Sequence, residues 1–316
     1  MVMSQAAGTA RAADKAFTVA APPVRCHRSM TGIRIGISGW RYAPWRGVFY
    51  PKDLVQRDEL AFAAREFPTI EINGSFYSLQ RPESWQAWYA AVPKGFVFSV
   101  KGPRFITHIL RLRDIEKPMA NFFASGVLAL GEKLGPILWQ FPPNFRFDAE
   151  TFEPFLRLLP KSMASAAALG KKHDAHLKRE AWLSVERNHR MRHAVEIRHE
   201  SFVTPDFIAL LRKYGVGFVV ADTAGKFPRY FDVTAPFVYV RLHGDKKLYA
   251  SGYGEEALAD WARRIRAWRR GSQPKGDPRI SRSAPAPRAS REVYVYFDND
   301  MKVKAPGDAR SLQALV

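Results

Sequence analysis

Each of eight short apolar segments in this 316-residue chain ends in polar residues. The types of these residues suit general acid/base chemistry on an anionic ligand. Successive residues of an extended segment point to opposite faces, so alternate residues share a surface. We expect one surface to be apolar and the other to end in a polar set. That set is Ser38, Glu71, Asn73, Lys101, Gln140, Glu196, Arg198, Asp222, Arg241, His243 and Asp298.

Two carboxylates in different environments can divide the roles of acid and base. Glu196 and Asp222 end neighbouring segments of the chain. We therefore expect Glu196 to act as the acid or base, assisted by Asp222 and His243. A fixed ion pair between Glu196 and Arg198 is the alternative, because structural ion pairs also perturb ionisation.

Binding of an anion is expected from Lys101 and Arg241, because both side chains recognise phosphate and carboxylate. Trp40 and Tyr77, in the loops after the first two segments, offer flat faces for a ring. The other expected substrate contacts are Arg198, Gln140, Asn73, Glu71 and Asp298. The predicted ligand is a small, anionic, ring-containing molecule.

The sequence offers too few converging ligands for a catalytic metal, since His243 is the one histidine with the inward parity. No nucleophile elbow or Walker-type loop occurs. The single cysteine, Cys26, excludes a disulfide framework and is compatible with a reducing cytoplasm, the expected compartment. We expect neither a metal nor a cofactor.

Strand-like and helical segments alternate along the chain, which favours a parallel sheet. The strand-like segments are 33–38, 69–73, 96–101, 136–141, 194–198, 217–222, 237–243 and 293–298. The helical ones are 58–66, 83–91, 117–133, 149–159, 205–214 and 255–270, with another from 308. Eight units predict a (β/α)8 TIM-type barrel over 32–316, whose sites lie at the strand C-termini. An open doubly wound sheet is the alternative, but its glycine-rich phosphate loop is missing at 36–40.

The net charge of +19 is concentrated in three regions. Residues 161–193, an Ala-rich and then basic helical pattern, hold eight basic and three acidic residues, and 262–291 hold ten and one. Together with a tail at 1–31 that we expect to be disordered, they carry most of the excess. The insertions, 161–193 and the Pro-, Ser- and Arg-rich 271–290, could bind nucleic acid or be solvated surface. No run of about 18 apolar residues occurs, so no membrane association is expected.

Seven motifs resemble one known family. They are GISGWRYAPWRGVFYP at 36–51, EINGSFY at 71–77, FSVKGPRFITH at 98–108, GPILWQFPPNF at 135–145, HAVEIRHESF at 193–202, YVRLHG at 239–244 and VYVYFDND at 293–300. In this order they resemble the YecE-like family, the domain of unknown function 72. The resemblance implies a TIM barrel of undetermined activity. Similar proteins often have Asn at the position of Asp298, so a shared role for that position is in doubt.

Three hypotheses for function follow. The first is an enzyme, a hydrolase or lyase, acting on a small anionic ring-containing substrate at the C-terminal face of the barrel. The second is a nucleic-acid-associated protein that uses the basic insertions. The third is a protein that binds a metabolite without turnover.

Overall fold

A computed structural model describes residues 32–316; the predicted disordered tail at 1–31 and Cys26 lie outside the described residues. Eight parallel strands close into a barrel in which each strand pairs with the next and the last pairs with the first. They are β1 Ile33–Ser38, β2 Thr69–Ile72, β3 Val97–Lys101, β4 Leu134–Gln140, β5 His193–Glu196, β6 Gly217–Asp222, β7 Phe237–Leu242 and β8 Glu292–Phe297. The predicted (β/α)8 fold is confirmed, and the open sheet is excluded.

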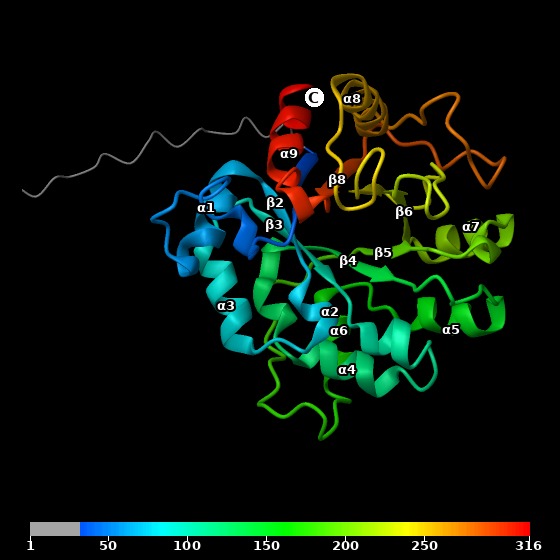
Figure 1. The fold of residues 1–316 in the computed structure, drawn as a ribbon. Helices are drawn as coiled ribbons and strands as arrows, with labels where there is room; N and C mark the ends of the chain where they lie inside the picture. The colour runs from blue at the N-terminus through cyan, green and yellow to red at the C-terminus, as the bar shows by residue number, and fades with distance from the viewer. Residues whose placement is uncertain (1–31) are drawn as a thin grey trace, which may run out of the picture.

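Most helices surround the barrel on its outer side, whereas the short α2, Gly74–Tyr77, follows β2 directly at the C-terminal rim (Figure 1). The others are α1 Glu59–Glu66, α3 Pro82–Ala91, α4 Glu116–Ala124, α5 Ala149–Leu158, α6 Met163–Gly170, α7 Pro205–Tyr214, α8 Glu255–Arg269 and α9 Ala305–Ala314. Local sequence sets their ends. In α7, the Thr204 hydroxyl accepts from the Phe207 N–H, Pro205 fills the first turn, and Gly215 ends the helix at φ 65°.

One predicted helix, 117–133, is instead two elements. The helix α4 stops at Ala124, and a 3-10 segment, η4 Val127–Lys133, follows it. Gly126 has φ 109° and Gly131 has φ 48°, a backbone region that glycine enters at little cost and that breaks an α-helix. The period of the apolar residues continues across both glycines, which is why the pattern predicts a single helix.

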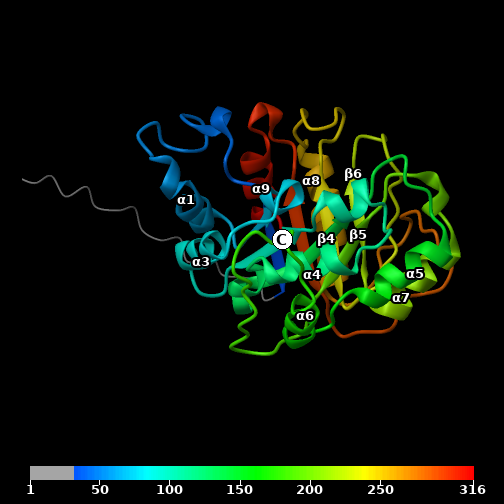
Figure 2. The same ribbon diagram turned by 90° about the horizontal axis from the view of Figure 1, so that it is seen from below.

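The two insertions contain little regular structure. In 161–193 a helix occupies Met163–Gly170 alone, so the predicted basic helical part is wrong. The segment 271–290 contains no helix or strand, as its prolines predict. Figure 2 shows this segment, in orange, passing beside α7. No helix among residues 32–316 is long and apolar enough to cross a membrane.

The barrel strands separate two kinds of surface. Their outward side chains, including Ile35, Ile70 and Val240, pack against the helices in the main core. The inward side chains form apolar and aromatic layers lower in the barrel, among them Leu138, Tyr239 and Tyr296. The polar side chains follow at the C-terminal ends. The barrel is therefore filled below and polar at its upper rim, which positions a site there.

Candidate functional site at the C-terminal rim

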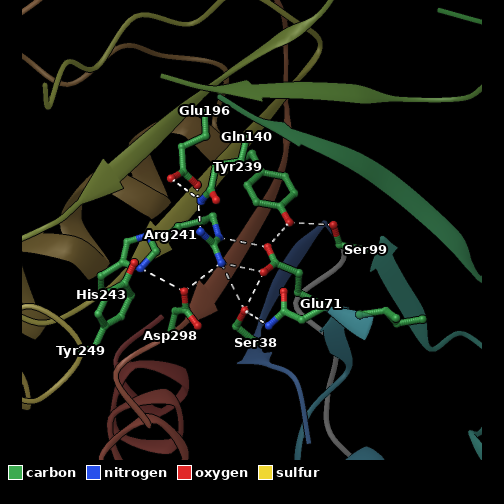
Figure 3. A network of polar contacts seen from close by, with 12 residues as sticks. Ser38, Glu71, Ser99, Gln140, Glu196, Tyr239, Arg241, His243, Tyr249 and Asp298 are labelled. Atoms are coloured by element: carbon green, nitrogen blue, oxygen red, sulfur yellow. Dashed lines mark hydrogen bonds and ion pairs between the residues drawn. The ribbon is translucent and has the colours of Figure 1, made fainter. Parts of the chain in front are cut away.

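Arg241, inward from β7, is the centre of a buried ion network (Figure 3). Its Nε and Nη2 donate to the two carboxylate oxygens of Glu71 at 3.1 and 2.8 Å. Its Nη1 lies 2.8 Å from a Glu196 oxygen, and its Nη2 lies 2.9 Å from Asp298. The Nε2 of His243 lies 3.3 Å from Nη1. With a side chain 1% exposed and every guanidinium nitrogen engaged, Arg241 has no spare donor for a ligand.

The carboxylates of Glu71 and Glu196 are likewise fully engaged in hydrogen bonds within the network. Glu71 also accepts from the Ser38 hydroxyl at 2.5 Å and the Tyr239 hydroxyl at 2.6 Å. Glu196 also accepts from Gln140 Nε2 at 2.7 Å and from Arg198 Nε at 3.1 Å. Both carboxylates are completely buried. They hold the network together and lie beneath the site.

The ionisation of Glu196 argues against the role predicted for it. Burial alone would raise the pKa of its carboxyl, but Arg241, Arg198 and His243 outweigh burial and hold the pKa well below its usual range. A group that stays ionised near neutral pH and has no free oxygen is a poor general acid or base. The alternative drawn from the sequence, an ion pair with Arg198, is the arrangement observed.

Asp222 lies apart from this network. Its neighbours Val219 and Ala221 occupy the barrel interior, so Asp222 has the outward parity. Its carboxylate accepts from Arg229 Nη1 at 2.9 Å. The inward orientation predicted for Asp222 is therefore wrong. Strand β6 is apolar on both faces before this residue, and alternation in the sequence could not assign its side.

A pocket of about 810 Å³ opens above the network. Eight of the expected site residues line it: Trp40, Asn73, Tyr77, Lys101, Gln140, Arg198, Arg241 and Asp298. Glu71, Glu196 and His243 lie beneath it or behind its wall, with His243 Nδ1 3.0 Å from Asp298 Oδ2. We call this the upper pocket. It brings together most of the predicted set, but with a different division of roles.

Lys101 is a buried cation of the upper pocket that forms no direct ion pair with the network. Its side chain, 8% exposed, comes from the end of β3, and its Nζ lies 4.0 Å from the centre of the Phe76 ring. No carboxylate of the described residues pairs with it within 4.0 Å. Burial, and next the charge of Arg241, lower the pKa of Lys101 to about 8. Glu71, Glu196 and Asp298 act on the ammonium only from beyond ion-pairing distance, so its Nζ has no direct ion pair among residues 32–316.

Asp300, which the sequence reasoning missed, adds a second carboxyl beside Asp298 in the same pocket. Burial, and next the charge of Asp298, raise the pKa of Asp300 to about 7. Arg241 and His243 outweigh burial at Asp298 and keep its pKa below the usual range. The signal was present, because Asp300 stands two residues after Asp298. However, the strand-like segment predicted from the sequence ends at 298, so strand parity was not extended to Asp300.

Aromatic side chains border the pocket. Trp40 meets Trp88 edge to face at 5.4 Å between ring centres, and Phe76 meets His108 at 5.0 Å. Burial, followed by the charge of Lys101, lowers the pKa of His108 to about 4, so its ring is neutral at pH 7. Tyr77 is largely exposed, and its side chain also lines a neighbouring apolar groove of about 360 Å³. The walls therefore suit a flat ring.

The loop after β3 supplies Arg104 and His108 to this wall, and its backbone is strained a few residues further on. Arg111, Leu112 and Asp114 have φ of 53°, 67° and 49°, values that non-glycine residues seldom adopt. A π-turn at Phe105–Ile109 precedes them. It places His108 in the pocket, with the exposed Arg104 before it. Such irregular backbone often accompanies functional sites.

Residues 32–316 hold no group of three or more His, Cys, Asp or Glu side chains placed to bind a metal ion. The arrangement at the rim thus offers an unpaired ammonium, one ionised carboxylate and one carboxyl titrating near neutrality. Those are groups for binding an anion and moving a proton.

Comparisons with known proteins agree with this architecture. Residues 34–316 match the family "Protein of unknown function DUF72". The UPF0759 protein YunF of Bacillus subtilis is 30% identical over 118 residues, which are 36% of this chain and 41% of that protein. A DUF72 protein of Thermotoga maritima has a similar structure, with a TM-score of 0.67 and 23% identity over 90% of this chain and 98% of that one. One from Enterococcus faecalis has a TM-score of 0.61 and 20% identity over 90% and 94%.

Proposed function

The chain belongs to the DUF72 family of proteins of unknown function, a membership that supplies a barrel but no reaction, and we propose that its upper pocket binds and transforms a small anionic, ring-containing molecule. The observation that carries this proposal is the buried Lys101 ammonium without an ion partner. A buried charge is costly unless paired. A carboxylate or phosphate of the ligand would complete the pair.

The pocket has an excess of positive charge for such a ligand. Five cationic side chains line it, namely Arg41, Lys101, Arg104, Arg198 and Arg241, against two acidic ones, Asp298 and Asp300. Arg198 and Arg241 are neutralised by the network. Lys101 and the exposed Arg41 and Arg104 are left to attract an anion.

The acid/base assignment moves from Glu196 to Asp300. A carboxyl with a pKa of about 7 is protonated in a large fraction of molecules at neutral pH, so it can donate a proton to a leaving atom. Asp298 remains ionised beside it, and its charge is, after burial, the next cause of the raised pKa of Asp300. The proposed enzyme is a hydrolase or a lyase. Its proposed compartment is the cytoplasm.

Substitution at Lys101 tests the proposal. Wild type, Lys101→Met and Lys101→Arg are screened against ring-containing carboxylates and phosphate esters for a rise in Tm and for turnover. Lys94→Met, which removes an exposed lysine outside the pocket, is the control. Lys101→Met should weaken binding by at least about tenfold, and Lys101→Arg should retain part of it. A ligand of the upper pocket that Lys101→Met binds as well as wild type contradicts the proposal.

Binding without turnover is the alternative to catalysis. A substitution at Asp300 distinguishes an enzyme from a protein that only binds the ligand. If the protein is an enzyme, Asp300→Asn should abolish most turnover while the ligand still raises Tm. If no member of the panel is converted by wild type although several bind, the alternative of a metabolite-binding protein replaces the proposal of catalysis.

A further inference from the structure

A second pocket lies at the opposite end of the barrel, and the two basic insertions meet there. It has a volume of about 580 Å³, and its walls include Gly215, Pro236 and Arg291, which directly precede or adjoin the starts of β6, β7 and β8. Lys161 and Arg190 come from the first insertion, and Arg288 lies in the second. We call this the basic pocket.

Six cations and no acidic side chain line the basic pocket: Lys161, Arg190, Arg212, Lys213, Arg288 and Arg291. Of these, Lys213 pairs with Glu153 at 2.7 Å. The other five have no carboxylate within ion-pairing distance among the described residues. Asp232, whose charge acts on Arg212, already accepts from the backbone N–H groups of Ile280 and Ser281.

Arg291 is a buried cation of this pocket whose hydrogen-bonding capacity is not fully used. It is 2% exposed, it donates to the carbonyl oxygens of Gly271 and Ala286, and it forms no ion pair with a carboxylate of residues 32–316. Its Nε is buried without a hydrogen-bond partner. The Nε of Arg212, which reaches Ser281 and Ser283 through its other nitrogens, is unpartnered as well. Two buried guanidinium donors therefore remain unused beside one cavity.

Burial and neighbouring positive charges lower the pKa of two of these cations. Burial, and next the charge of Arg288, lower the pKa of Arg291. Burial, and next Arg190, lower the pKa of Lys161. Side chains that only served to hold the fold would gain from intervening acids, and the pocket has none. An external anion in the pocket would relieve the repulsion among these cations.

We propose that the basic pocket binds a multiply charged phosphoryl anion, such as a polyphosphate or the phosphate chain of a nucleotide. Four of its six cations are arginines, whose forked donors match the oxygens of phosphate. A pocket of about 580 Å³ has room for a small ligand. The middle of the first insertion lies elsewhere, since Lys172 pairs with Glu116 and Asp174 accepts from Asn121 near α4. The basic charge is thus not one continuous track for a long nucleic acid.

The test compares two double variants of the full chain that each remove two positive charges. Arg190→Gln with Arg288→Gln changes two exposed pocket residues. Arg179→Gln with Arg187→Gln changes two exposed arginines of the first insertion that lie outside the pocket. Binding of sodium tripolyphosphate is measured by calorimetry and by the rise in Tm. The pocket variant should bind at least about tenfold more weakly, and the control should stay within about twofold.

Equal weakening in both variants would show a general effect of charge and overturn the proposal, as would a wild type that does not bind tripolyphosphate. A labelled 20-nucleotide RNA or DNA separates the two sources of phosphate. Competition by tripolyphosphate for one site supports the proposal. Tighter binding of the oligonucleotide with a steep dependence on salt, unaffected by tripolyphosphate, assigns the surface to nucleic acid instead. Neither variant touches the upper pocket, so its ligand should bind both equally.

Discussion

Arg241 binds Glu71 side-on across the barrel, with Nε and Nη2 of the guanidinium donating to the two oxygens of the carboxylate. Strands β7 and β2 are far apart in the barrel, so this fork joins two of its sides. Glu196 and Asp298 complete the environment of the same guanidinium. Arg241 therefore links several strands across the rim of the barrel, and it forms part of the floor of the upper pocket.

Replacing this arginine should cost more stability than any other single change at the rim. Arg241→Met leaves up to three buried carboxylates without their shared cation. We expect a loss of about 3–5 kcal/mol in the free energy of unfolding, measured by urea denaturation. The exposed Arg41→Met is the matched control and should change it by less than about 0.5 kcal/mol. A loss below about 1 kcal/mol at Arg241 would mean that the network is not structural.

Glu196 should behave as a structural residue. Its pKa in the folded protein is lowered, so its contribution to stability is present above the usual carboxyl pKa and is lost as the pH falls below about 4.5. Glu196→Gln should reduce stability at pH 7 and flatten the fall in stability between about pH 5 and 3. Thermal unfolding against pH measures this. An unchanged slope would show that Glu196 is not held ionised by Arg241.

The contribution of Asp300 to stability should change with pH in the opposite direction to that of Glu196. Its pKa in the folded protein is raised to about 7, so its contribution is present below the usual carboxyl pKa and is lost as the pH rises toward 7. Asp300→Asn should therefore be more stable than wild type at pH 8 and nearly equal to it at pH 4. If the two proteins differ equally at both pH values, the carboxyl does not titrate in this range.

Binding of the anionic ligand should weaken in two steps as the pH rises. Ionisation of Asp300 near pH 7 adds a repelling charge, and deprotonation of Lys101 near pH 8 removes the attracting one. Affinity measured from pH 5.5 to 9.5 should thus be greatest at the acidic end. Asp300→Asn should retain the second step alone. A ligand whose affinity rises with pH would not be held as an anion by Lys101.

Asp222 should be dispensable for the upper pocket. Asp222→Asn removes a carboxylate that pairs with Arg229 on the outer side of the barrel. We expect ligand affinity within about twofold of wild type and a stability loss of about 1 kcal/mol. Affinity and Tm measured on one preparation check both. A large loss of affinity without a loss of stability would return Asp222 to the site.

Much of this protein could be predicted from local sequence. Alternating strand and helix patterns predict the closed barrel, because hydrophobic periodicity is carried by residues that are neighbours in the chain. The same alternation predicts that Lys101, Gln140 and Asp298 meet at the C-terminal rim. It fails where it carries no information, as at Asp222 in a strand that is apolar on both faces, and at Asp300 beyond the end of β8.

The chemical role of each polar residue depends on its neighbours in the folded protein. Residue types and alternation predict that carboxylates and cations share a rim. They do not reveal that Arg241 pairs with three of the carboxylates, while Lys101 forms no ion pair with any carboxylate of residues 32–316. The sequence also placed excess charge in two insertions without indicating that Arg190 and Arg288 line the same cavity. Ionisation and pairing depend on distances of a few ångströms between residues that are remote in the chain, and folding alone sets those distances.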